Sequence, residues 1–480
     1  MAASEARAPR RVVRATGRLV ALRVALTAWL GRPLASFHLV LAVFSLLTVL
    51  GLVMVLSAST VLSIQTGDGL YTVFKKQLLY VLVGLVVFWI GVRVPLARIR
   101  ASSPGAMALG LVSLVLVLTP LGSRVNGTQS WFQVGTFFSF QPVEFCKIAL
   151  ALWGAHVLVV KRAVLYRYRH LLVPVVPAAL LMFALVMLQP DLGGTVTLGI
   201  VLIALLWFAG APMRLFGAIA LGALAGAALL AVGTGYRLAR VVSFFSPEDD
   251  QTASGYQALQ ARLALADGGL FGRGLGQGSS KWDFLPNVHN DFIFALIGDE
   301  LGLLGCALVL GLFAMLAIVG MRIATRNIDP WIRMVAATLT VWLVGQAAIN
   351  IGYVVGLLPV TGITLPLISS GGTSIVVTML VFGILANCAR HEPEAVSALR
   401  SQGPGRFGRL MRLPAPDPYQ PPKKRKPVRP SAPPRGMGRP TGNAARRQAS
   451  ERQGRGTAVR QTTRQKASRG DPRTAKGGRR

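Results

Sequence analysis

The sequence predicts an all-α polytopic membrane protein with about ten transmembrane helices, a large extracytoplasmic loop between helices seven and eight, and both termini in the cytoplasm. Apolar residue types make up 52% of the 480 residues and charged types only 14%, whereas soluble domains carry about 25% charged residues. Several apolar runs reach the length of about 20 residues that a spanning helix needs. A soluble protein of the ordinary class is therefore excluded.

The apolar runs give the expected helices in order. They lie at roughly 37–57, 77–95, 104–121, 142–160, 170–189, 192–210, 213–233, 291–320, 331–356 and 370–389. Runs of this length must be helical, because lipid offers no partners for open backbone groups. The short connections on either side of 192–210 predict tight helical hairpins.

Lysine and arginine in the short connections set the orientation, since they gather on the cytoplasmic side. With the N-terminus inside, the inner connections contain Arg93, Arg98, Arg100, Lys161, Arg162, Arg167, Arg169, Arg214, Arg322, Arg326 and Arg333. The outer connections hold little beyond Lys75, Lys76 and Arg124. An even number of helices then places both termini in the cytoplasm.

The net charge of +33 is concentrated in two basic ends around the apolar body. We expect a cytoplasmic N-terminal segment at 1–36, a membrane domain at 37–390 and a tail at 391–480. The tail should be disordered, because it is rich in Pro, Gly, Arg and Gln and poor in apolar residues. Its run KKRK at 423–426 fits anionic lipid, at about 1 kcal/mol per basic residue. A protein-binding tail and a plain solvated tail stay open, and no nucleic acid partner is expected.

The connection at 234–290 is predicted to be a large polar outer loop, and loops of that length are usually functional. Its glycines, in LADGGLFGRGLGQGSS, indicate tight turns or backbone close to a ligand. The loop ends at His289 and Asp291, where the next helix begins. Asp291 either caps this helix or stands at the mouth of a cavity. Residues 291–300 are expected to extend the helix outside the spanning part.

Polar residues elsewhere in the apolar body mark further candidates, because ionisable groups in membrane segments are costly. Glu144 and Lys147 lie at i and i+3 in FQPVEFCK, so they can pair on one helix face. That pair is either structural or a lysine placed for an anionic ligand. Asp191, in QPDLGG, is expected to cap a helix.

The segment NIGYVVGLLPVTGITLPLISSGGTS, at 350–374, is interrupted by prolines and glycines and is rich in hydroxyl groups. Non-helical backbone near a membrane is tolerated where it lines a cavity. We therefore expect a site wall rather than a plain loop. Its candidate substrate-binding residues are Thr361, Ser369, Gly371 and Gly372.

Several chemistries leave no signature in this chain. It has no Walker loop, no Cys/His metal spacing and no G-x-S-x-G elbow. Cys146, Cys306 and Cys388 all lie in apolar stretches, so no disulfide framework is expected. No metal site or cofactor is predicted, although a divalent cation bound with the substrate stays open.

At these motifs the chain resembles the SEDS family of shape, elongation, division and sporulation proteins, which includes FtsW, RodA and SpoVE. The matching segments are FQPVEFCK, QPDLG, GYQ…GGLFGRGLG, LPNVHNDFIFALIGDELG and GLLPVTGITLPLISSGGTS, in the family's order across 37–390. The family's fold, ten helices with a large loop between helices seven and eight, agrees with the expectation above.

The resemblance implies a peptidoglycan glycosyltransferase that polymerises lipid II at the outer membrane face, with release of undecaprenyl diphosphate. The family's essential aspartate matches Asp291, and its helix-four pair matches Glu144 and Lys147. The division-type members of actinobacteria resemble this chain most, and RodA-type elongation proteins are the nearest rival. Implied partners are a cognate class B penicillin-binding protein and other divisome membrane proteins, at the septum in the plasma membrane. The tail could contact cytoplasmic division proteins.

The predicted mechanism is a single inverting displacement, since an α-linked diphosphate leaves and a β-1,4 linkage forms. Asp291 is the expected general base for the acceptor hydroxyl. Lys147 is the first candidate for contact with the diphosphate, and Arg240, Arg262 and His289 are further substrate-binding candidates. A lipid II flippase is the main alternative, because broken helices with polar residues also describe transporters. A scaffold that only recruits its partner is the third alternative.

Overall fold

The computed structural model describes residues 31–66, 71–125, 127–135, 138–233, 254–278 and 289–420. Arg240, the run at 423–426 and nearly all of 1–36 lie outside these ranges, so the predictions made for them stay predictions. Of the connection at 234–290, predicted to be a large outer loop, the structure describes 254–278 and the last two residues.

The described part of the chain contains the expected apolar helices. Seven of the described helices are long and apolar enough to cross a membrane, α7 and α8 are apolar but shorter, and α9 contributes a shorter apolar stretch at Met213–Gly222. The helices are α2 (Ala35–Thr66), α3 (Thr72–Arg93), α4 (Leu96–Leu116), α5 (Pro142–Val160), α7 (Val175–Met187), α8 (Leu192–Phe208), α9 (Met213–Gly233), α12 (Ile293–Arg326), α13 (Pro330–Val354) and α14 (Thr373–Arg390). A short helix of five residues, α6 (Tyr168–Leu172), precedes α7. The prediction of a polytopic helical membrane protein is confirmed at this level.

Local sequence signals fix where several of these helices begin. Pro142 and Pro330 occupy the first turns of α5 and α13, where the missing N–H of proline has no helical partner to lose. The Asp329 carboxylate accepts a hydrogen bond from Trp331 N at 2.8 Å and caps α13. Asp191 caps α8 in the same way through Gly194 N at 2.7 Å. The predicted capping role of Asp191 is confirmed.

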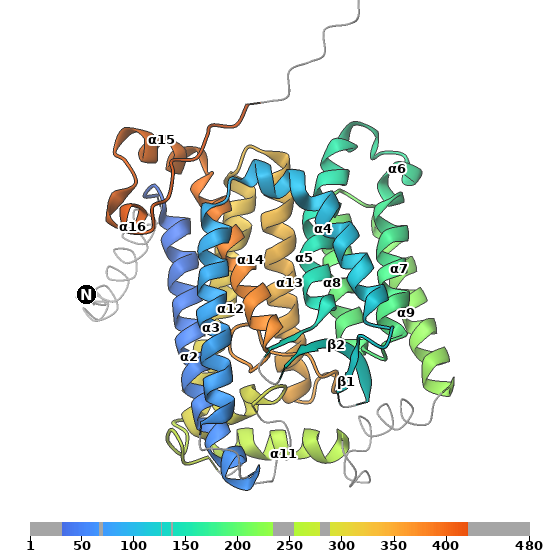
Figure 1. Cartoon of the computed structure of the whole chain (residues 1–480), viewed down its shortest axis with the longest axis vertical. Coiled ribbons are helices and arrows are strands. Elements are labelled where there is room, and N and C mark those ends of the chain that lie inside the picture. The colour runs from blue at the N-terminus through green and yellow to red at the C-terminus, as the bar shows by residue number, and fades with distance from the viewer. Residues whose placement is uncertain are drawn as a thin grey trace, which may run out of the picture. The chain divides into compact units, whose positions relative to one another are not determined.

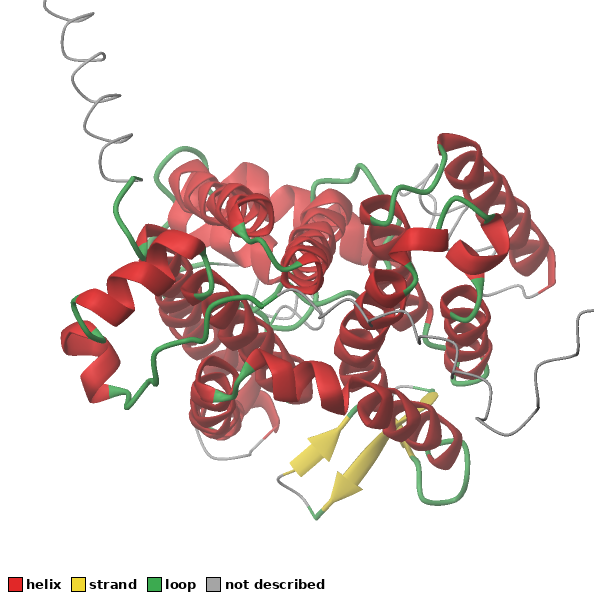
Figure 2. Cartoon of the chain, turned by 90° about the horizontal axis from the view of Figure 1, so that it is seen from above, coloured by secondary structure: helices red, strands yellow, loops and turns green. Residues whose placement is uncertain are grey.

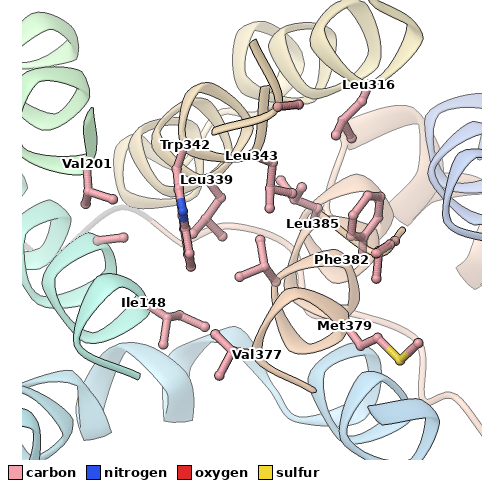
Figure 3. Packing of buried hydrophobic residues seen from close by; sticks show 14 of the residues in the cluster. Ile148, Val201, Leu316, Leu339, Trp342, Leu343, Val377, Met379, Phe382 and Leu385 are labelled. Atoms are coloured by element: carbon pink, nitrogen blue, oxygen red, sulfur yellow. The ribbon is translucent and has the colours of Figure 1, made fainter. Parts of the chain in front are cut away.

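The helices pack around α14 and α13. Helix α14 contacts α2, α3, α5, α12 and α13, while α13 also packs against α5, α8 and α12 (Figure 1). In Figure 3, Leu339, Trp342 and Leu343 of α13 point into a shared cluster with Ile148 of α5 and side chains of α14. These two helices are therefore the interior supports on which a site can be built.

A small antiparallel sheet corrects the all-α prediction. Strands β1 (Ser123–Val125), β2 (Thr128–Val134) and β3 (Phe138–Phe140) lie in the order β1-β2-β3 between α4 and α5, at the edge of the bundle (Figure 2). The Tyr80 hydroxyl accepts a hydrogen bond from Ser139 N at 2.9 Å, so α3 holds the last strand. Strands β1 and β3 have only three residues each, too few for an alternating pattern to show in the sequence.

Helix α12 is broken at Gly302, whose backbone has φ 67° and ψ −163°. The connection before α12 packs into this break, because Leu303 N donates to Gly269 O at 2.9 Å and Arg273 N donates to Asp299 O at 2.9 Å. The predicted change at residue 300, from an outer extension to a spanning helix, coincides with the break. The connection itself contains a helix, α11 (Ser254–Asp267).

Two helices follow α14 in the region predicted to be a disordered tail. They are α15 (Pro393–Ser401) and α16 (Gly405–Leu410), and the described chain continues to residue 420. Arg390 Nη2 donates to Pro414 O at 2.5 Å, and Trp89 Nε1 donates to Met411 O at 3.0 Å. Composition concealed these specific contacts between 391–420 and the helix ends, while the domain boundary at 391 stays a prediction.

Candidate functional site

The loop–helix junction and the broken segment before α14 meet at one end of the bundle, the end that also carries α11 and the sheet (Figure 1). Ser370 N donates to His289 O at 3.0 Å, and the Ser370 hydroxyl donates to Asn290 Oδ1. The two segments that sequence analysis selected separately are thus directly bonded to each other.

Asp291 lies at this junction, partly exposed, two residues before α12 begins. Its main-chain oxygen accepts hydrogen bonds from Asn350 Nδ2 at 2.9 Å and from the Tyr353 hydroxyl at 2.8 Å. Its carboxylate faces Gly362, where an added Cβ would lie 3.6 Å from Oδ2. The main chain of Asp291 is therefore fixed by α13, and its carboxylate is directed toward the segment around Gly362.

The segment 361–372 forms a wall with a defined internal structure. Gly362 and Gly372 have φ of +69° and +43°, a left-handed region that glycine enters without cost. Ser369 is buried and its hydroxyl accepts from Leu365 N at 2.8 Å. Ser369 therefore shapes the wall from inside, and the structure does not present it to a substrate.

Of the other predicted wall residues, Thr361 packs against the turn at Gly193. Its carbonyl lies 3.1 Å from where a Cβ on Gly193 would be, and its Oγ1 is buried with no hydrogen-bond partner among the described residues. Gly371 lies against Ser374, and Gly372 lies against Tyr80 and Ser139. The two glycines thus join the wall to α14 and to the sheet.

The QPDLGG turn packs behind this wall. Asp191 Oδ2 accepts from Gln141 Nε2 at 3.1 Å, in addition to the cap at Gly194. Burial raises the pKa of the Asp191 carboxyl, and the nearby Glu144 carboxylate adds to the increase, while the bond from Gly194 N opposes it. Gly193 allows the turn to approach the wall closely. Asp191 is a supporting residue rather than an exposed acid.

Glu144 and Lys147 form the predicted ion pair, with Lys147 Nζ 2.8 Å from Glu144 Oε2. The lysine is only 1% exposed, and its ammonium also lies 5.1 Å from the centre of the Trp342 ring and 3.5 Å from Gln346 Oε1. No surface of Lys147 is available to a ligand in this arrangement. Of the two readings that the sequence allowed, the structure favours the structural pair.

The remaining substrate-binding candidates differ in placement. His289 is in the junction itself, and burial lowers the pKa of its imidazole, so the ring is neutral at pH 7. Arg262, on α11, packs against Gly356 just beyond the end of α13, with its Nε 3.3 Å from the position of a Cβ there. Arg262 therefore lies beside the C-terminal end of α13, while Arg240 is outside the described residues.

Three polar residues of α13 escaped sequence analysis: Gln346, Asn350 and Tyr353. Each is at most 2% exposed. A signal was present, because a glutamine and an asparagine interrupt the apolar run at 331–356, and polar groups inside membrane segments default to function. Within the described residues, no group of three or more His, Cys, Asp or Glu side chains could hold a metal ion.

The sequence profile of the cell cycle proteins FtsW, RodA and SpoVE matches residues 37–394. The probable peptidoglycan glycosyltransferase FtsW of Mycobacterium tuberculosis is 52% identical over 397 residues, covering 82% of this chain and 76% of the relative. Stage V sporulation protein E of Bacillus subtilis is 39% identical over 348 residues, covering 72% of this chain and 94% of the relative.

Solved structures with the same fold agree with the sequence relatives. One is a chain of a peptidoglycan synthase complex that coordinates polymerization and crosslinking, with 26% identity, a TM-score of 0.62 and coverage of 76% of this chain and 99% of that one. Another is a variant of the rod shape determining protein RodA of Thermus thermophilus, with 25% identity, a TM-score of 0.53 and the same coverage. The chain belongs to the family of cell cycle proteins that comprises FtsW, RodA and SpoVE.

Proposed function

We propose that this protein is a peptidoglycan glycosyltransferase that joins the disaccharide units of lipid II into glycan strands, with Asp291 as the general base. The observation that carries the proposal is the placement of Asp291, whose main chain is bonded to α13 while its carboxylate is partly exposed at the wall around Gly362. The relatives that carry the glycosyltransferase name support the reaction class.

The reaction proceeds by one displacement. The acceptor sugar's 4-hydroxyl oxygen attacks the anomeric carbon of the donor, the bond from that carbon to the diphosphate oxygen breaks, and undecaprenyl diphosphate leaves. The proton of the hydroxyl passes to the Asp291 carboxylate. One carboxylate is enough, because a diphosphate leaves without the acid that an alcohol leaving group needs. Proton transfer of this kind contributes about 10²–10⁴-fold.

The membrane orientation follows from the charge distribution. The basic short connections and the α15–α16 region lie at the end opposite the site (Figure 1), so the positive-inside rule puts that end in the cytoplasm. Asp291 then faces the outside, where lipid II is polymerised. A multi-pass location in the plasma membrane, with both termini inside, is part of the proposal.

A division role is favoured over an elongation role, because the 52% identity is to FtsW proteins of mycobacteria, whereas the RodA structure shares 25%. The solved complex that coordinates polymerization and crosslinking supports a crosslinking partner, for which a class B penicillin-binding protein is proposed on the basis of the family. Other divisome membrane proteins are proposed as further partners on the basis of the family alone.

The test is polymerisation of purified lipid II by the purified protein, alone and with its penicillin-binding partner. Asp291→Asn should keep the fold and lose at least about 10²-fold in rate, since it removes the base. Asp329→Asn is the matched control, because Asp329 caps α13 at the opposite end. Strands at the wild-type rate from folded Asp291→Asn would refute the base. Lipid II movement across liposomes without strands from wild type would support the flippase instead, and neither activity would favour the scaffold.

A further inference from the structure

One face of α13 carries four buried polar side chains: Trp342, Gln346, Asn350 and Tyr353. Their spacing of four, four and three residues places them in one row along the helix. All four are at most 2% exposed. Buried polar groups are costly unless they are hydrogen-bonded, so the partners of this row indicate its purpose.

The outer end of the row bonds to both segments that border the site. Asn350 Nδ2 lies 2.9 Å from Asp291 O and 2.7 Å from Ile363 O, and the Tyr353 hydroxyl lies 2.8 Å from each of the same two carbonyls. Asn350 Nδ2 also lies 2.6 Å from the Tyr353 oxygen. The amide and hydroxyl together supply three hydrogens, which matches three acceptors. The junction and the wall therefore share one pair of donors.

The middle of the row continues the same connection. Gln346 Nε2 donates to Thr364 O at 3.0 Å, so a second point of the wall is tied to α13. Gln346 Oε1 accepts from Trp342 Nε1 at 2.9 Å and lies 3.5 Å from Lys147 Nζ. The buried Glu144–Lys147 pair thus supports the amide that holds the wall.

We propose that Gln346, Asn350 and Tyr353 are positioning residues that set the distance between the Asp291 carboxylate and the wall at 361–364. They touch no substrate, because all three are buried; they act through main-chain carbonyls. The inference rests on the proposed function, since it assigns a purpose to the geometry around the proposed base. The inference also gives the Glu144–Lys147 ion pair of α5 a supporting role in place of direct contact with the diphosphate.

The physical basis is that the junction and the wall belong to different elements and would otherwise move independently. The segment between α13 and α14, which includes the wall, contains Pro359, Gly362 and Pro366 and has no helix of its own. Side chains of helix α13 bond to both the junction and the wall, so this one helix fixes the position of each relative to the other. A displacement of about 1 Å at a reacting group can cost about 10²-fold in rate, so loss of a shared donor should lower turnover more than substrate affinity.

The experiment compares three variants in lipid II polymerisation, with kcat and KM measured separately together with the melting temperature. Tyr353→Phe keeps the ring, which packs edge-on against Phe292, and removes only the hydroxyl. Asn350→Leu removes the shared amide. Asn387→Leu is the matched control, because Asn387 is also a buried asparagine whose Nδ2 bridges two carbonyls, Gly91 O at 2.9 Å and Val94 O at 2.7 Å, away from the site.

We expect Tyr353→Phe to lower kcat about tenfold and Asn350→Leu to lower it about 10²-fold, each with KM within about twofold of wild type. Asn387→Leu should lower the melting temperature and leave kcat unchanged. The inference is overturned if Tyr353→Phe keeps wild-type kcat, if the losses appear in KM, or if Asn387→Leu loses as much kcat as Asn350→Leu. Wild type that forms no strands would overturn the proposed function, and this inference with it.

Discussion

At the scale of single residues, Lys147 shows the limit of a sequence pattern. The i, i+3 spacing predicted its pairing with Glu144, and the structure confirms that pair at 2.8 Å. The spacing could not reveal that the ammonium is enclosed by Gln346 and Trp342, because those contacts come from residues some 200 positions away. Asp291 was found because it stands where a long polar connection enters the next helix and because it matches the aspartate of a family motif, and both signals are local in the sequence.

The enclosure of Lys147 gives the first prediction. Lys147→Met alone leaves the Glu144 carboxylate buried without its partner, which should destabilise the protein by about 3–5 kcal/mol. The double variant Glu144→Gln with Lys147→Met should recover most of that loss, because it removes both charges. Melting temperatures in detergent measure the two effects.

The double variant also separates the two roles assigned to the lysine. A buried structural pair predicts a KM for lipid II close to wild type in the folded double variant. A KM raised about tenfold or more, with the melting temperature restored, would show that the ammonium contacts the diphosphate after all. Glu144→Gln alone serves as the control for the loss of the anion.

At the scale of elements, the apolar runs predicted the helices well, because burial in lipid imposes a long and uniform signal. Their ends were less accurate: the run at 37–57 extends to Ala35–Thr66, and the one at 170–189 shortens to Val175–Met187. The sheet at 123–140 and the helices after 391 were missed, since short polar elements are specified by tertiary contacts. In the sequence, the polar row of α13 was visible only as Gln346 and Asn350 within an apolar run, and the hydrogen-bond partners of these residues could not be seen.

Gly302 tests how the outer loop is held to α12. Its φ of 67° suits glycine, and a Cβ there would meet Gly272 N and Leu270 O. Gly302→Ala should therefore displace the turn at 268–278 and cost about 1–3 kcal/mol from backbone strain alone. Limited proteolysis of the loop and the melting temperature measure the displacement.

Gly311→Ala is the control for that substitution, because Gly311 lies in the same helix and a Cβ there meets nothing within 4 Å. It should be neutral or slightly stabilising, since alanine is the better helix former by about 1 kcal/mol. Equal protease sensitivity of the two variants would show that the loop does not depend on the break in α12.

At the scale of the whole molecule, α13 connects the end of the bundle that carries the candidate site with the opposite end, where Asp329 caps the helix. Its 25 residues span about 37 Å, with the Asp329 cap at one end and the Tyr353 contact to Asp291 at the other. The sequence motifs identified the end near Asp291, because its polar residues lie in short contiguous segments of the sequence. The opposite end could not be predicted, because Arg390 and Trp89 meet their carbonyl partners only in the folded chain.

Truncation separates the structural contribution of that opposite end from the activity of the site. A chain ending at Gln420 keeps the carbonyls of Met411 and Pro414 and the buried Leu413, so it should melt like the full chain. A chain ending at Ser401 removes these partners and leaves the buried Arg390 guanidinium without its contact to Pro414, which should lower the melting temperature by several degrees, since an unsatisfied buried donor costs about 1–3 kcal/mol. Below its melting point the shorter chain should retain the wild-type kcat, because neither Asp291 nor its α13 contacts are touched. Loss of kcat in a folded chain ending at Ser401 would show that the two ends are coupled through the helices.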